Sequence, residues 1–106
     1  DDFTCFYQVR KSNYIFPGET HDYYELTYID HGTLDTTVDG QKYRLQKYDL
    51  ILYYPGQFHT QSTDDQSTCS YLTITFDMDN KLPGDLKKSC IPYTHKMIFI
   101  KFCLNL

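Results

Sequence analysis

The sequence predicts an all-β fold, an antiparallel sandwich or small barrel, from three observations. Short runs rich in Tyr, Thr and Ile recur about every ten residues along the first 78 positions. A turn signal separates each run from the next, and no helical period competes before residue 80. Short strands at such even spacing are typical of antiparallel sandwiches and barrels.

The expected strands follow one another in chain order: 23–29, 33–38, Gln41–Leu45, 49–54 and 68–78. The turn signals are Pro17-Gly18, His31-Gly32, Asp39-Gly40, Pro55-Gly56 and the polar stretch 62–67. Asp39-Gly40 is a strong hairpin signal, because a two-residue type I′ turn needs positive φ at both central residues. Residues 1–14 contain the apolar FTCFYQVR and are expected to form either a barrel strand or a lid.

The stretch TCSYLTITFDM, residues 68–78, alternates most clearly and is expected to be a strand with one buried face. One face carries Ser70, Leu72, Ile74, Phe76 and Met78, and the other carries Cys69, Tyr71, Thr73, Thr75 and Asp77. Tyr71 and Thr73 therefore share a polar face. That face is either exposed to solvent or lines the interior of the barrel.

Composition and charge exclude several classes of protein. A net charge of -4 and no basic run longer than Lys87-Lys88 leave no electrostatic footprint for nucleic acid on this chain. No segment has the length of a membrane span and no signal peptide is visible, so a cytoplasmic location is expected. The four cysteines, Cys5, Cys69, Cys90 and Cys103, form no C-x-x-C pair, which favours reduced thiols and leaves disulfides open.

Two motifs carry the chemistry. PGETHDYYELTYIDHG places Glu19, His21 and Glu25 ahead of Gly32, and YDLILYYPGQFH ends on His59. Their spacing resembles the cupin pattern, in which G, H-x-H, E and G form the first motif and a proline turn followed by H forms the second. Glu19 stands where the first cupin histidine is expected, and Thr63 stands in place of the asparagine that often closes the second motif.

Within cupins, H-x-x-Y-E-L-x-Y-I-x-x-G, D-G-x-x-Y-x-L and D-L-I-L-x-x-P-G-x-x-H resemble the amino-terminal sensing domain of AraC-type transcriptional regulators. The resemblance implies a cupin-like double-stranded β-helix, or jelly-roll barrel, over residues 1–80. It also implies a small effector, often a sugar, a homodimer, and a helix-turn-helix DNA-binding domain that lies outside this chain. Residues 81–106 are expected to be helical or part of a dimer surface, and both ends look like cuts from a longer protein.

The sequence is ambiguous about metal. Glu19, His21, Glu25 and His59 suit Mn, Fe, Ni or Zn. On an uninterrupted strand, however, His21 and Glu25 would lie about 13 Å apart at roughly 3.3 Å per residue, too far for one coordination sphere unless a turn or bulge intervenes. The AraC-type branch also generally lacks the metal. We therefore predict a binding module without metal or other cofactor.

The residues predicted to contact the effector are Tyr23, Glu25, His59, Gln61, Tyr71 and His21. For His59 a surface or strand-end position is the alternative, and for Glu25 a structural anchor that caps backbone amides or a tyrosine hydroxyl. Two other functions stay open. One is a metal-dependent cupin enzyme of the dioxygenase or sugar isomerase type, and the other is a dimerisation module without ligand.

Overall fold

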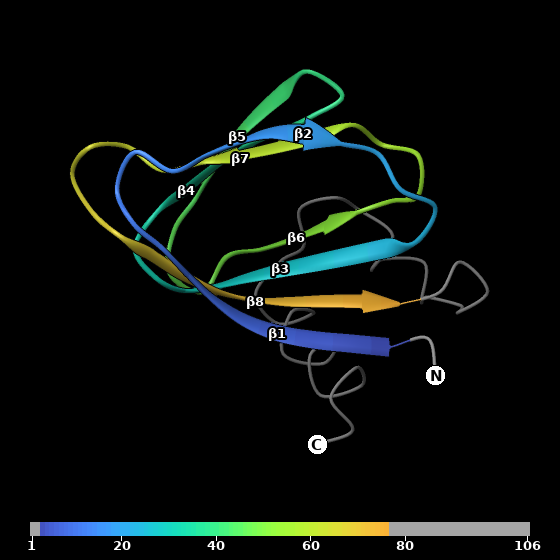
Figure 1. Ribbon diagram of the computed structural model, residues 1–106, viewed down its shortest axis with the longest axis horizontal. Coiled ribbons are helices and arrows are strands. Elements are labelled where there is room, and N and C mark those ends of the chain that lie inside the picture. Colours follow the sequence, from blue (N-terminus) through green and yellow to red (C-terminus); the bar gives the residue numbers. More distant parts are fainter. Residues whose placement is uncertain (1–2, 77–106) are drawn as a thin grey trace.

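Strands pair into two antiparallel sheets in the computed structural model, which describes residues 3–76 (Figure 1). The strands are β1 (Phe3–Arg10), β2 (Ile15–Glu19), β3 (Tyr24–His31), β4 (Leu34–Val38), β5 (Gln41–Leu45), β6 (Leu50–Tyr53), β7 (His59–Ser62) and β8 (Cys69–Phe76). One sheet has the order β1-β8-β3-β6 and the other β2-β7-β4-β5. The two sheets face each other, and most connections cross from one to the other (Figure 1). This is the predicted all-β jelly-roll barrel.

The hairpin between β4 and β5 has the predicted turn. Val38 pairs with Gln41, so the loop has two residues, Asp39 with φ 48° and Gly40 with φ 86°. Positive φ at both positions is the type I′ geometry, whose twist matches that of the flanking strands. This prediction is confirmed.

The amino-terminal arm is a strand and not a lid. β1 pairs antiparallel with β8 along its whole length, from Phe3 opposite Phe76 to Arg10 opposite Cys69. Among the strands of residues 3–76, β1 lies at one edge of its sheet and has β8 as its single neighbour.

Pro17-Gly18 lies within β2 and does not form the expected turn. The β2–β7 register shifts between Phe16 and Glu19, so the irregularity falls at Pro17 and Gly18. Proline has no N–H to donate and is tolerated in a strand at a bulge of this kind. β2 therefore continues past the proline and ends at Glu19.

β8 is buried on both faces, so the expectation of a single buried face was wrong. Cys69, Tyr71 and Thr73 point into the barrel, where Tyr71 packs with Ile29, Leu34 and Tyr53. Ile74 and Phe76 point to the opposite face and form a second apolar cluster with Leu26, Leu50 and Leu52. The face with the polar residues lines the interior, which resolves the alternative left open for Tyr71 and Thr73.

Three further observations bear on the sequence predictions. Cys5 and Cys69 are free thiols, and burial raises the pKa of the Cys69 thiol to about 11. Among residues 3–76 there is no helix with the length and apolar character needed to cross a membrane. The predictions for 81–106, and for Cys90 and Cys103, fall outside the described residues.

Gly32 is expected to be essential to the β3–β4 connection. Its φ is +81°, and a Cβ there would lie 2.1 Å from the backbone oxygen of Thr68. Gly32→Ala should therefore lower the free energy of unfolding by at least ~2 kcal/mol, from left-handed strain and displaced backbone together. Urea denaturation measures this loss.

Gly56→Ala is the matched control, because Gly56 has φ +85° but no atom of the described residues lies within 4 Å of the added Cβ. It should cost only the conformational part, about 1 kcal/mol. Equal losses for the two variants would contradict the role given to the contact with Thr68.

Candidate functional site

Four polar side chains converge at one end of the barrel. Glu19 is the last residue of β2 and pairs with His59, the first residue of β7. Glu25 is the second residue of β3, and His21 lies in the connection between β2 and β3. One ligand atom from each side chain lies within 4.8 Å of all the others.

A bend in the β2–β3 connection brings His21 back to Glu25. The chain bends at Asp22 and Tyr23, and β3 begins only at Tyr24. The His21 Nε2 to Glu25 Oε1 distance is 3.0 Å, so the chain does not run extended between them, and the intervening turn that a shared site requires is present.

Both imidazoles present Nε2 to the carboxylates. His21 Nδ1 lies 2.9 Å from the carbonyl oxygen of Tyr23, and its ring stacks on the Tyr23 ring with 3.9 Å between centroids. His59 Nδ1 lies 3.4 Å from the carbonyl oxygen of Gln57, and its ring stacks on Tyr53 at 4.0 Å. Each Nδ1 is thus directed at a backbone carbonyl oxygen, and each Nε2 faces the cluster.

Glu25 holds the centre of the cluster. Its Oε1 lies 3.0 Å from His21 Nε2 and 3.7 Å from His59 Nε2, and its side chain is 13% exposed. Burial alone would raise the pKa of this carboxyl. The two imidazoles outweigh burial, and the pKa of Glu25 lies below its ordinary value. Glu25 is therefore an ionised carboxylate buried against two rings.

The donor set fits a divalent transition metal ion. Two imidazole nitrogens and two carboxylate oxygens are a common ligand set for Mn, Fe, Ni or Zn. The four His–Glu distances range from 3.0 to 4.0 Å. Ligands about 2.1 Å from one ion are separated by roughly this much. The Nδ1 contacts to backbone carbonyls are the outer-shell bonds that fix a histidine ligand.

A cavity of about 230 Å³ extends from this cluster into the barrel. β1 contributes Phe6, Gln8 and Arg10 to its lining, and the opposite sheet contributes Phe16 and Gln61. Glu19 and Glu25 line its other end. Apolar rings beside polar groups that point inward are typical of a small-molecule site.

A series of hydrogen bonds connects two residues that line this cavity, Arg10 and Gln61, to buried side chains behind them. Arg10 Nε donates to the Tyr71 hydroxyl at 3.0 Å, and that hydroxyl donates to Gln61 Oε1 at 2.9 Å. Gln61 Nε2 donates to the Tyr53 hydroxyl at 3.0 Å. Burial raises the pKa of both phenols, so each stays protonated and keeps its hydrogen to donate.

The series ends with the hydrogen bond between the Tyr53 and Thr36 hydroxyls, and the neighbouring bond of Thr36 determines its direction. The Thr36 hydroxyl lies 2.8 Å from the Tyr53 hydroxyl and donates to the carbonyl oxygen of Thr60 at 2.7 Å. Because Thr36 has only one hydrogen, Tyr53 must donate to Thr36. Every donor in the series therefore points away from Arg10.

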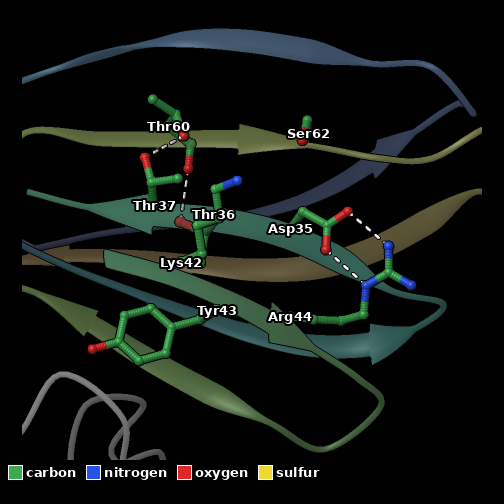
Figure 2. A pocket seen from close by; sticks show the side chains of 8 residues that line it. All are labelled: Asp35, Thr36, Thr37, Lys42, Tyr43, Arg44, Thr60 and Ser62. Atoms are coloured by element: carbon green, nitrogen blue, oxygen red, sulfur yellow. Dashed lines mark hydrogen bonds and ion pairs between the residues drawn. The ribbon is translucent and has the colours of Figure 1, made fainter. Parts of the chain in front are cut away.

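A second hollow, of about 470 Å³, lies on the outer face of the β2-β7-β4-β5 sheet (Figure 2). Its main polar groups already pair with one another: Arg44 binds both carboxylate oxygens of Asp35 at 2.8 and 2.9 Å, and the hydroxyls of Thr37 and Thr60 lie 2.6 Å apart. We therefore assign the candidate site to the interior cavity.

Comparison with known proteins agrees with this geometry. The family model described as the AraC-like ligand binding domain matches residues 4–81. The chain belongs to this family. It is also 30% identical over 74 residues to YbfI, an uncharacterized HTH-type transcriptional regulator of Bacillus subtilis (strain 168). That match covers 70% of this chain and only 25% of the regulator.

Solved structures of low identity support the fold. A cupin protein from Bacteroides fragilis superposes with a TM-score of 0.71 at 18% identity, covering 87% of this chain and 80% of that one. The DMSP lyase DddQ from Ruegeria pomeroyi superposes with a TM-score of 0.67, also at 18% identity, covering 77% and 42%. The AraC-like ligand binding domain thus has the cupin-like barrel predicted from the motifs.

The barrel of this AraC-like domain brings together most of the predicted site residues. His21, Glu25 and His59 meet in one cluster, and Tyr23 stacks on His21. Gln61, which lines the cavity, bonds to Tyr71 behind it. The prediction that these residues contact an effector stays a prediction.

Sequence reasoning missed Arg10 and Tyr53. Arg10 occupies the same face of β1 as Phe6 and Gln8, and all three line the cavity. The alternation of FTCFYQVR places these three side chains on one face but does not indicate which face turns inward. Nothing in the sequence of the buried strand β6 indicated that Tyr53 belongs to this hydrogen-bonded series.

The lowered pKa of Glu25 predicts an acid-dependent loss of stability. A carboxyl whose pKa is lower in the folded chain stabilises the fold above its unfolded pKa, near 4.5, and loses that contribution as pH falls through the folded value. Glu25→Gln should therefore flatten the profile of Tm against pH below pH 4.5, relative to the unsubstituted chain.

Glu19→Gln is the control, because the Glu19 side chain is 47% exposed and water screens its interactions. It should leave most of the acid-dependent loss in place. A profile for Glu25→Gln parallel to that of the unsubstituted chain would contradict the pairing of Glu25 with the imidazoles.

Proposed function

We propose that this chain is the effector-sensing part of an AraC-type transcriptional regulator and binds a small polar metabolite in the barrel. The observation that carries the proposal is the interior cavity with its inward-facing polar groups, in a chain that belongs to the AraC-like ligand binding domain family. DNA binding by a helix-turn-helix domain, a cytoplasmic location and homodimer formation are parts of the same proposal. The helix-turn-helix domain is supported by the HTH-type regulator, a quarter of which this chain matches.

β1 is the element through which an effector would act. Among the described strands it is an edge strand that pairs with β8 alone, and its inward side chains line the cavity. A ligand that contacts Phe6 and Gln8 would favour the state in which β1 is paired. The response is limited by the difference in ligand affinity between the two states.

Binding is tested by a thermal-shift screen of the full chain against sugars, polyols, sugar acids and small organic acids. A ligand present at 100 times its Kd adds about 2.7 kcal/mol, which raises the Tm of a domain of this size by roughly 10 °C or more. Glu25→Gln should weaken the binding of any hit at least tenfold.

Thr37→Val is the control, because Thr37 faces the outer hollow and not the cavity. It should bind the hit unchanged. If no compound in the panel changes Tm and the chain still forms a dimer, the sensor is rejected in favour of a dimerisation module without ligand.

A metal-dependent function is the second candidate, favoured by the four donor atoms within 4.8 Å of one another. Glu19, His21, Glu25 and His59 would hold the ion. The ion would supply a Lewis acid, or in a redox metal an electron acceptor, at the end of the cavity. An enzyme of the dioxygenase or sugar isomerase type is the corresponding activity.

Elemental analysis tests this candidate. The chain, purified without a histidine tag after growth with added Mn, Fe, Ni and Zn, should contain about one equivalent of metal. His59→Ala should remove the metal, whereas His31→Ala, at an exposed position at the end of β3, should retain it. Unsubstituted protein without metal under these conditions would reject the candidate.

A further inference from the structure

Arg10 is a cation that has no carboxylate partner among residues 3–76. Its Nε donates to the Tyr71 hydroxyl and its Nη2 donates to Gln8 Oε1, each at 3.0 Å. The guanidinium carbon lies 4.4 Å from the centroid of the Tyr14 ring. All these partners are neutral, and the two hydrogen bonds occupy two of the five N–H donors of the guanidinium.

Arg10 and Arg44 differ in how their positive charges are balanced. Arg44 is exposed on the outer face, and Asp35 neutralises its charge through two bonds. Arg10 is partly buried, where charge is costlier to leave unpaired, and it lines the interior cavity. Within the described part of the chain, the inner arginine thus has no counter-ion of the kind that the outer arginine has.

Arg10 and the Glu25 cluster lie toward opposite ends of the barrel. Arg10 pairs with Cys69 and Glu25 pairs with Thr75, six residues apart on β8, so their Cα atoms are separated by roughly 20 Å along the strands. Glu25 already has its imidazole partners, so it does not neutralise Arg10. The positive charge at the Arg10 end is available to a ligand.

We propose that the effector is a small hydroxylated carboxylic acid, of the aldonic or uronic type, whose carboxylate pairs with Arg10. A planar guanidinium binds a carboxylate through charge-assisted and often bidentate hydrogen bonds. Thr73 and Gln61, farther along the wall, offer polar groups to hydroxyls, and the volume of about 230 Å³ admits only a small molecule. This inference rests on the proposed sensing function.

Matched pairs of probes test the charge directly on the full chain. Titration calorimetry compares D-galacturonate with D-galactose and D-gluconate with D-glucitol, together with the hits of the panel and their neutral counterparts. The acid of a pair should bind at least tenfold more tightly, because a hydrogen bond to a charged group contributes more than one to a neutral group. Arg10→Gln should remove this preference, with a 10- to 100-fold loss for the acid.

Two further variants make the result specific. Arg10→Lys, which keeps the charge but not the planar fork, should retain part of the preference. Arg44→Gln removes an arginine outside the cavity and should change nothing in binding. If Arg10→Gln does not fold, the inference is tested by two other results: the preference of the unsubstituted chain for the acid over its neutral partner, and the part of that preference retained by Arg10→Lys.

The outcomes separate this inference from the function on which it rests. Acids that bind in preference to their neutral partners and lose that preference with Arg10→Gln support it. Neutral sugars that bind as tightly as their acids, or a preference that survives Arg10→Gln, overturn the acidic effector and leave the sensor standing. No binding by any compound in the panel overturns both.

Discussion

The interior of the barrel depends on one directed series of hydrogen bonds between the two sheets. Tyr71 and Tyr53 belong to one sheet, and Gln61 and Thr36 to the other. Removing one member would leave its neighbours buried and unsatisfied, at about 1–3 kcal/mol for each group. Because the series begins at Arg10, a positive charge aligns every donor behind it, and such alignment strengthens each bond. The cavity wall is therefore both polar and rigid.

Features that depend on residues adjacent in the sequence could be predicted from it, whereas features that depend on contacts between distant residues could not. The type I′ turn at Asp39 and Gly40 was predictable because two residues determine it. The cluster of His21, Glu25 and His59 was recognisable by spacing, yet its distances were not, because the bend after His21 has no strong propensity signal. The position of Arg10 in the cavity depends on the register of β1 against β8, which no local pattern specifies.

β8 shows why alternation alone did not identify the interior. An alternating strand in an antiparallel sheet usually buries its apolar face and exposes its polar one. Here the polar side chains of Tyr71 and Thr73 face the interior of the barrel, whereas Ile74 and Phe76 pack on the other side of the sheet. A barrel that holds a polar interior needs hydroxyls there, so the polar face becomes the functional one. Only the pairing of the two sheets distinguishes this case from solvent exposure.

The two ends of the cavity differ in how their charge is balanced, and this difference determines where selectivity arises. At the Glu25 end the imidazoles lie beside the carboxylates, so either these rings or a metal ion among the four donors can compensate the negative charge without any effector. At the Arg10 end the described residues offer only hydroxyl, amide and ring partners, which orient the guanidinium but do not neutralise it. A neutral ligand would leave that charge as it is, whereas an anion removes the cost of burying it. Discrimination between an acid and its neutral analogue therefore arises at Arg10, whichever ion occupies the other end.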